Sequence, residues 1–188
     1  MKPIVLGIAG ASASGKSTFC DMLIKDLSDL KVTAIRTDNY FKENLPKMVS
    51  PTSKIEYDDY NHPESVDYNK VIEDLHTLIQ RGKENDIIIL EGIMILYFEE
   101  FRKLLDLKIF IDLDSDERMY RRIKRNMALW GLGMEEVAEY FLDAAKHRER
   151  EYVLSTKMFA DIIINGNNLE PYPLEVIAGW IRNKVNKN

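Results

Sequence analysis

Apolar residues along this chain follow two kinds of pattern, which together predict an alternation of buried strands and amphipathic helices. Short apolar, partly β-branched runs are typical of strands that are covered on both faces of a sheet. Longer stretches with apolar residues three or four positions apart are typical of helices that lie on such a sheet. The predicted strands are 4–9, 32–37, 87–90, 107–113 and 161–165. The predicted helices begin near residue 16 and continue with 67–80, 96–105, 114–130, 135–154 and 173–184.

This alternation predicts an α/β fold, with three αβα layers built on a parallel five-stranded sheet. No repeat, low-complexity segment or convincing linker interrupts the pattern, so residues 1–188 are predicted to form a single domain. Parallel sheets bind ligands beyond the carboxyl ends of their strands. Polar residues that directly follow a predicted strand are therefore the first candidates for a functional site.

The first strand leads into a phosphate-binding loop, Gly10-Ala11-Ser12-Ala13-Ser14-Gly15-Lys16-Ser17, followed by Thr18. The loop fits G-x-x-x-x-G-K-[ST] and lies between a strand and a helix, as this motif requires. Its glycines permit positive φ, so backbone N–H groups can point at phosphate oxygens next to the helix N-terminus. Lys16 is expected to bridge the β- and γ-phosphates, and Ser17 to ligate Mg²⁺. The sequence therefore predicts a P-loop NTPase fold in which residues 10–18 bind ATP.

The composition is that of an ordinary soluble globular protein, with 45% hydrophobic and 30% charged residues. A net charge of −5 without a long basic run argues against nucleic acid or a membrane surface as partner. No stretch approaches the ~20 apolar residues of a membrane span, and the first strand begins too early for a signal peptide. The single cysteine, Cys20, excludes an internal disulfide and is expected in the core. We expect a cytoplasmic protein, and a homo-oligomer is left open.

Two acidic residues also follow predicted strands and would meet the phosphate-binding loop at one edge of the sheet. Asp38 comes just after the second strand and is the best candidate for a base that takes a hydroxyl proton; its alternative role is a turn or cap acid. Glu91 follows four apolar residues, as a Walker B acid does, and is expected to hold Mg²⁺ directly or through water. In an empty site Glu91 would pair with Lys16.

The helix predicted at 114–130 begins with acidic residues and carries four arginines. The spacing of Asp114 and Glu117 predicts a capping box at its first turn. Ion pairs Asp114–Arg118 and Glu117–Arg121, each four residues apart, account for two of the arginines.

The other two arginines, Arg122 and Arg125, have no acid four residues before them and are assigned to ligand oxygens. Their helix would belong to a helical lid, at about residues 118–150, that closes over the nucleotide and excludes water.

A GTPase would normally carry Asn-Lys-x-Asp, but Asn69-Lys70-Val71-Ile72 fails at the fourth position. A small single domain instead favours phosphoryl transfer to a small hydroxyl acceptor.

The chain resembles, over most of its length, the uridine kinase family of P-loop nucleoside kinases, which is related to phosphoribulokinase. The resemblance rests on the phosphate-binding loop and on Asp38-Asn39-Tyr40-Phe41, Tyr60-Asn61-His62-Pro63-Glu64-Ser65-Val66-Asp67, Leu90-Glu91-Gly92-Ile93, Arg121-Arg122-Ile123-Lys124-Arg125 and residues 155–164.

This resemblance implies an ATP-dependent kinase acting on a primary hydroxyl, with Asp38 as base. It places Arg122 at the sugar and Arg125 at the phosphates. Four residues would line the acceptor side, although packing is an alternative role for the aromatic ones and a turn cap for the histidine. They are Tyr40, Tyr60, Asn61 and His62.

Three departures from the family pattern concern the acceptor and the lid. The base-recognising hairpin of uridine kinases has no room here, because 78–86 joins a helix directly to a strand. The acid before His-Pro, which holds ribose hydroxyls in the family, is Asn61. The usual Arg-Gly-Arg of the lid is Trp130-Gly131-Leu132.

The aperiodic loop after residue 41 is expected to be functional or mobile.

The expected function is transfer of the ATP γ-phosphoryl to a hydroxyl of a nucleoside or similar small acceptor. One alternative is a kinase for another ribosyl compound, such as nicotinamide riboside. Another is a nucleotide-binding regulatory protein without turnover, which the missing hairpin and lid arginines suggest. The joint presence of Lys16, Ser17, Asp38 and Glu91 weighs against the regulatory protein.

Overall fold

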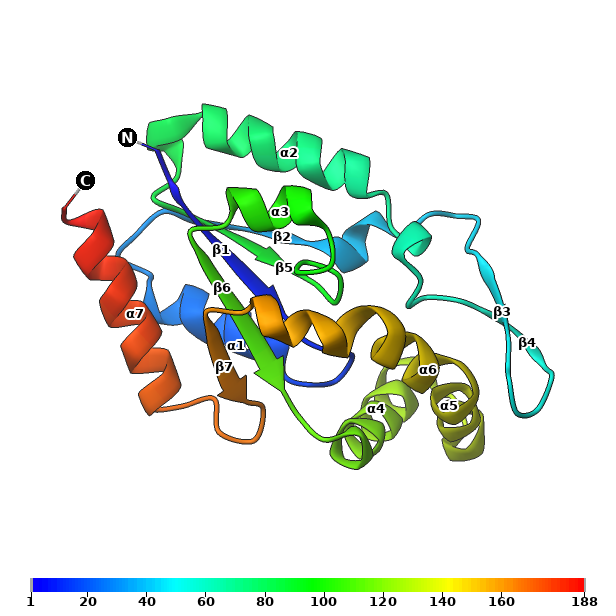
Figure 1. Cartoon of the computed structure of the whole chain (residues 1–188). Helices are drawn as coiled ribbons and strands as arrows, with labels where there is room; N and C mark the ends of the chain where they lie inside the picture. Colours follow the sequence, from blue (N-terminus) through cyan, green and yellow to red (C-terminus); the bar gives the residue numbers. More distant parts are fainter. Residues whose placement is uncertain (1, 188) are drawn as a thin grey trace.

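The computed structural model describes residues 2–187, which form a parallel sheet with helices on both faces (Figure 1). The predicted five-stranded parallel sheet is confirmed, with strand order β2-β5-β1-β6-β7. Each strand lies where the apolar runs predict one. The strands are β1 (Ile4–Ala9), β2 (Val32–Arg36), β5 (Ile87–Glu91), β6 (Leu107–Asp112) and β7 (Ile162–Asn165).

Helices fill the segments between the strands, and most match their predicted bounds. They are α1 (Lys16–Asp26), α2 (Tyr68–Gln80), α3 (Glu99–Leu104), α4 (Ser115–Trp130), α5 (Met134–Tyr140), α6 (Lys146–Arg148) and α7 (Tyr172–Val185). The helix predicted at 96–105 is shorter, because Phe98 is extended and caps α3. Within residues 2–187, no helix has the length and apolar character needed to cross a membrane.

The segment predicted as one helix at 135–154 is helical but irregular. Its α-helical turns in α5 and α6 alternate with π-helical turns at Phe141–Ala145 and Glu149–Val153, and a 3₁₀ turn follows at Leu154–Phe159. Such π-turns change which side chains face a given direction, and they are frequent at functional sites.

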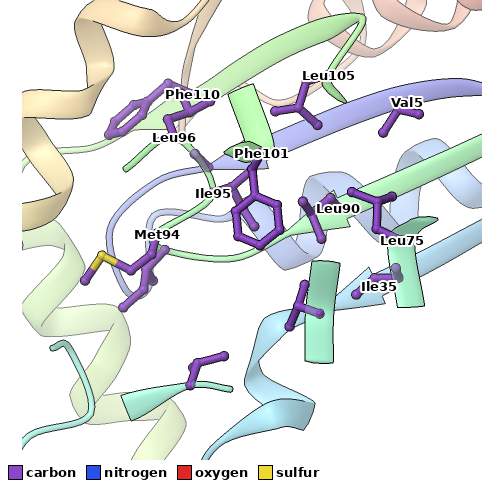
Figure 2. Close-up of a cluster of buried hydrophobic side chains, with 14 of the residues drawn as sticks. Val5, Ile35, Leu75, Leu90, Met94, Ile95, Leu96, Phe101, Leu105 and Phe110 are labelled. Atoms are coloured by element: carbon purple, nitrogen blue, oxygen red, sulfur yellow. The ribbon is translucent and has the colours of Figure 1, made fainter. Parts of the chain in front are cut away.

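The hydrophobic core has two halves, one on each face of the sheet. Helices α2 and α3 cover one face, and α1 and α7 cover the other (Figure 1). On the first face, side chains of the central strands contact Leu75 of α2 and Phe101 of α3 (Figure 2). On the second face, Cys20 is fully buried beside Leu23 of α1, as expected for a core residue. This double cover explains why β5 is a continuous apolar run.

The long segment between β2 and α2 contains structure that the sequence pattern did not predict. Strands β3 (Lys47–Val49) and β4 (Glu56–Asp58) form a short antiparallel hairpin, which lies beyond the carboxyl edge of the sheet (Figure 1). The prediction of an irregular loop is therefore wrong for these strands. With three residues each, they are too short to produce a recognisable alternation.

Truncating Phe101 should destabilise the fold strongly. Its ring is 1% exposed and lies 5.8 Å from the Tyr68 ring and 5.9 Å from the Phe98 ring. Phe101→Ala should lower the free energy of unfolding by about 3–5 kcal/mol, measured by urea denaturation. Val176→Ala, on α7 where the side chain is 63% exposed, is the control and should stay within about 0.5 kcal/mol of the parent. Equal effects from the two variants would contradict this description of the core.

Candidate active site

The phosphate-binding loop connects β1 to α1 in a conformation that suits an anion. Gly10, Ala13 and Gly15 have positive φ values of 150°, 64° and 106°. A Cβ atom at Gly10 would lie 2.5 Å from the carbonyl oxygen of Ile111, so only glycine fits there. Positive φ at these three positions lets backbone N–H groups of the loop turn toward a bound anion, and α1 begins directly after Gly15. The residues present therefore fit the phosphate groups of a nucleotide.

Three predicted site residues meet where β1 and β5 end. The ammonium Nζ of Lys16 lies 3.7 Å from Glu91 Oε1, and Ser17 Oγ donates a hydrogen bond to the same oxygen at 3.2 Å. Burial raises the pKa of Glu91, while the charge of Lys16 lowers it. The contact between Lys16 and Glu91 is the one expected in the absence of ligand. A hydroxyl beside a buried carboxylate is also a donor set that suits Mg²⁺.

Asp38 lies at the same edge, in the 3₁₀ turn Thr37–Tyr40 that follows β2. The parallel register pairs Arg36 at the end of β2 with Glu91, so Asp38 follows this pair by two residues. Its side chain is exposed, and its negative charge raises the pKa of both Glu91 and Arg125. Asp38 is thus close enough to act on the groups that are expected to hold phosphate.

Arg122 and Arg125 approach this edge from α4. Arg122 is buried, and its guanidinium carbon lies 5.1 Å from the centroid of the Tyr140 ring. Arg125 donates a hydrogen bond to the Asn126 side chain at 3.1 Å. Partial desolvation and repulsion from Arg122 lower the pKa of Arg125, and Asp38 raises it. The two arginines and Asp38 therefore belong to one electrostatic cluster.

The ion pairs predicted within α4 are not formed, and this prediction is wrong. Arg118 pairs with Glu149 and donates to the Leu113 carbonyl at 2.9 Å. Arg121 donates to the Gly166 carbonyl at 3.1 Å. Tertiary acceptors thus replace the acids one turn away.

The predicted capping box at the start of α4 is also wrong. Asp114 is the N-cap residue, but its side chain makes no capping hydrogen bond. The Glu117 carboxylate accepts hydrogen bonds from the Asn167 amide at 2.7 Å, after β7. This contact holds the carboxylate away from the first turn of the helix.

The four residues predicted on the acceptor side have different surroundings. Tyr40 donates a hydrogen bond to Asp74 of α2 at 2.8 Å, and burial followed by this bond raises its pKa to about 12. Tyr60 is exposed, with its ring 6.5 Å from that of Tyr140. The buried Asn61 directs its amide at the Tyr140 hydroxyl, 3.4 Å away. Substrate contact by any of them stays a prediction.

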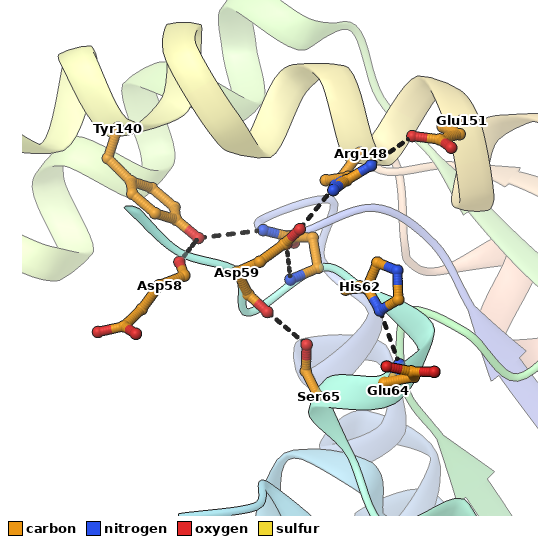
Figure 3. A network of polar contacts seen from close by, with 9 residues as sticks. Asp58, Asp59, His62, Glu64, Ser65, Tyr140, Arg148 and Glu151 are labelled. Carbon is orange, nitrogen blue, oxygen red and sulfur yellow. Dashed lines mark hydrogen bonds and ion pairs between the residues drawn. The ribbon is translucent and has the colours of Figure 1, made fainter. Parts of the chain in front are cut away.

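His62 acts in the structure as a cap. Its Nδ1 accepts a hydrogen bond from the backbone N–H of Glu64 at 3.1 Å, at the start of the 3₁₀ turn Pro63–Ser65 (Figure 3). Its ring lies 5.5 Å from that of Tyr152. These contacts agree with the alternative role that the sequence left open for this residue.

The irregular helical segment at 134–159 brings further residues to the site that sequence reasoning missed. Arg148 binds the buried Asp59 at 2.6 Å, and the other Asp59 carboxylate oxygen accepts the Asn61 backbone N–H at 3.0 Å (Figure 3). The next residue, Glu149, accepts the backbone N–H of Ser12 in the phosphate-binding loop at 3.2 Å. One helical turn therefore holds both the segment before His-Pro and the loop.

The hairpin β3–β4 contacts the same helical segment. Tyr57 donates a hydrogen bond to Asp143 at 3.0 Å, and Ser53 also donates to Asp143. The Tyr57 and Tyr140 rings meet edge to face at 5.7 Å.

Between α2 and β5 the described chain has only a 3₁₀ turn, so a hairpin there is absent, as the sequence indicated.

Comparison with known proteins identifies the family of this chain. The chain matches the model of the phosphoribulokinase / uridine kinase family over residues 55–169. A uridine kinase from Streptococcus agalactiae serotype V is 32% identical, over 87% of each protein. One from Clostridium novyi is 31% identical, over 100% of this chain and 99% of its own. Uridine-cytidine kinase A from Dictyostelium discoideum is 34% identical over 97% of this chain, which spans 40% of that longer protein.

Two solved structures share the fold. A putative fructose transport system kinase from a Silicibacter species has a TM-score of 0.66 and 16% identity, covering 86% of this chain and 89% of its own. A possible uridine kinase from Bacillus stearothermophilus has a TM-score of 0.57 and 16% identity, covering 88% and 90%. At this level of identity the similarity describes the fold alone.

Adding a methyl group at Gly10 should weaken nucleotide binding. Gly10→Ala would bring Cβ against the Ile111 carbonyl at a φ that alanine rarely adopts. A strain of roughly 1–3 kcal/mol corresponds to an ATP affinity about 5-fold to 150-fold lower, measured by calorimetry. Gly179→Ala, on α7 with open space around it, is the control and should bind ATP as the parent does. Unchanged affinity in Gly10→Ala would contradict the role given to this loop.

Proposed function

This chain belongs to the phosphoribulokinase/uridine kinase family, and we propose that it transfers the γ-phosphoryl group of ATP to a hydroxyl of a small acceptor. The observation that carries this proposal is the meeting of four groups at one edge of the sheet. They are the phosphate-binding loop, the Lys16–Glu91–Ser17 contact, the exposed Asp38 and the arginines of α4.

The loop and Lys16 supply the donor side of the site. The backbone N–H groups of the loop would bind phosphate oxygens, and the Lys16 ammonium would exchange Glu91 for the β- and γ-phosphates. Ser17 and Glu91 would hold Mg²⁺, which neutralises phosphate charge when bound. Once the Lys16 ammonium has moved to the phosphates, the Glu91 carboxylate is free to bind Mg²⁺.

Asp38 and the arginines would carry out the transfer. The acceptor oxygen forms a bond to the γ-phosphorus while the bond from that phosphorus to the β–γ bridging oxygen breaks, which releases ADP. The hydroxyl proton passes to the Asp38 carboxylate. Arg125 would stabilise the charge of the transferring group, and Arg122 would hold the acceptor.

The helical segment 118–150 would act as a lid over this reaction. Its residues contact the phosphate-binding loop through Glu149 and the segment before His-Pro through Arg148. A lid that is tied to both sides keeps water from the γ-phosphate and so limits ATP hydrolysis. The ten residues between Gln80 and Glu91 form no base-recognising hairpin, so we extend the candidate acceptors beyond uridine to other ribosyl compounds and small alcohols.

Acceptor-dependent release of ADP tests the proposal. Purified protein with Mg²⁺ and ATP should release ADP faster when one of a panel is added: nucleosides, nicotinamide riboside, pantothenate and simple sugars. Lys16→Ala should lower the rate at least 100-fold, because it removes a charge that stabilises the transferring phosphoryl. Lys25→Ala, an exposed lysine on the same helix, is the control. Full activity in Lys16→Ala would refute the assignment, and ATP binding without turnover would favour a regulatory protein.

Replacing the base should affect turnover more than binding. Asp38→Asn keeps the shape of the side chain but cannot accept the hydroxyl proton, so kcat should fall about 10²–10⁴-fold. The ATP dissociation constant, measured by calorimetry, should stay within about threefold of the parent. Asp116→Asn, an exposed acid of α4, controls for the loss of one charge. Loss of ATP binding in Asp38→Asn would make Asp38 a structural residue instead.

A further inference from the structure

Arg122 is a buried cation whose hydrogen-bond partners are incomplete. Only 8% of its surface is exposed, and its Nε and Nη1 atoms are buried without an acceptor among residues 2–187. A guanidinium removed from water is strongly destabilising unless an anion or other acceptors replace its hydration. The missing acceptors are therefore expected from a ligand.

Three carboxylates of the helical segment and of the segment before His-Pro already have partners. Each forms an ion pair with another side chain, so none of these three is free to neutralise Arg122. The pairs are Asp59 with Arg148, Glu149 with Arg118, and Asp58 with Lys47.

The position of Arg122 links it to the acceptor side rather than to the phosphates of ATP. Its guanidinium lies over Tyr140, whose hydroxyl donates to the Asp58 carbonyl at 3.2 Å and receives the Asn61 amide at 3.4 Å. Both of these groups come from the segment before His-Pro. Asn61 is neutral, so it provides a hydrogen bond but no charge. Arg125 adds a second positive charge; partial desolvation and repulsion from Arg122 lower its pKa, while the negative charge of Asp38 raises the pKa of Arg125.

We propose that the acceptor is an anionic alcohol, which carries a carboxylate or phosphate group in addition to the hydroxyl that is phosphorylated. This anion would accept the free hydrogen bonds of Arg122 and neutralise its charge. Because Arg125 is assigned to the transferring phosphoryl group, a neutral alcohol would leave the Arg122 guanidinium without an anion. The inference rests on the proposed function, in which Arg122 holds the acceptor.

Matched alcohols with and without an anion test this inference. Glycerol, glycerate and glycerol 3-phosphate each keep a free primary hydroxyl, and pantothenate is matched by its neutral alcohol pantothenol. We expect kcat/KM for at least one anionic member to exceed that of its neutral partner by tenfold or more. Glycerate and glycerol 3-phosphate distinguish a carboxylate from a phosphate. Equal or better use of the neutral member in every pair that is turned over, or turnover of uridine alone, would overturn the inference and leave the kinase proposal intact.

Two variants connect this preference to the residues. Arg122→Gln should reduce the preference for the anion at least tenfold. Asn61→Asp keeps the shape of the side chain but adds a negative charge beside Tyr140. It should also reduce the preference for the anionic alcohol at least tenfold, without changing KM for ATP. Asn183→Asp, exposed on α7, is the charge control and should keep the parent preference. A preference that survives in Asn61→Asp and in Arg122→Gln would overturn the inference.

Binding separates failure of this inference from failure of the proposed function. If no acceptor promotes ADP release, the same pairs are titrated by calorimetry into protein loaded with Mg²⁺ and ADP. Tenfold tighter binding of an anionic member, lost in Asn61→Asp, would support the inference even though the kinase proposal had failed. Equal binding within every pair, or no binding at millimolar concentration, would overturn it.

Discussion

The parallel pairing of β1 with β5 is the constraint on which the candidate site depends. This register pairs Ile8 with Glu91, and the register of β2 pairs Arg36 with the same residue. The phosphate-binding loop, Glu91 and Asp38 therefore leave the sheet at one level, although they are separated by up to 80 residues in the chain. Because the strands are buried on both faces, a shift of one residue would exchange the side chains that pack on the two faces and disrupt both halves of the core. The stability of the core thus fixes the geometry of the site.

The irregular helical segment after α4 has a second organising role. Asp143 contacts the β3–β4 hairpin, Arg148 holds Asp59, and Glu149 binds the phosphate-binding loop. In a regular helix, adjacent residues such as Arg148 and Glu149 point about 100° apart, and a π-turn that begins at Glu149 alters this relation. The phosphate-binding loop and the segment before His-Pro are therefore connected through one element. In the proposed reaction, closure of this segment on ATP would change the affinity for the acceptor, and binding of the acceptor would change the affinity for ATP.

Much of the fold and the phosphate-binding part of the candidate site could be predicted because they depend on local patterns. Apolar runs mark the five strands, and the loop motif names Lys16 and Ser17 without any tertiary information. Glu91 and Asp38 follow from their place after a strand. The contacts of Glu149 with Ser12 and of Arg148 with Asp59 span 137 and 89 residues, and no spacing along the chain predicts them. In the charged stretch 146–151 these residues look like a solvated helix face.

The same reason explains the wrong prediction for Arg118 and Arg121. Their spacing from Asp114 and Glu117 fits ion pairs within α4, and only the tertiary structure offers Glu149 and Gly166 as acceptors. Sequence spacing shows which pairs are within reach, whereas burial decides which of them form. A fully buried arginine such as Arg118 takes the buried carboxylate, because there the ion pair replaces lost hydration.

In the proposed reaction, phosphorus moves from ATP to a carbon-bound hydroxyl at this edge of the sheet. Phosphorus-31 NMR of the protein with Mg²⁺, ATP and a mixture of small alcohols observes this transfer directly. We expect a new phosphate-monoester resonance that grows in step with ADP while inorganic phosphate stays low. Release of inorganic phosphate alone, or an ATP spectrum that does not change although the nucleotide is bound, would contradict it.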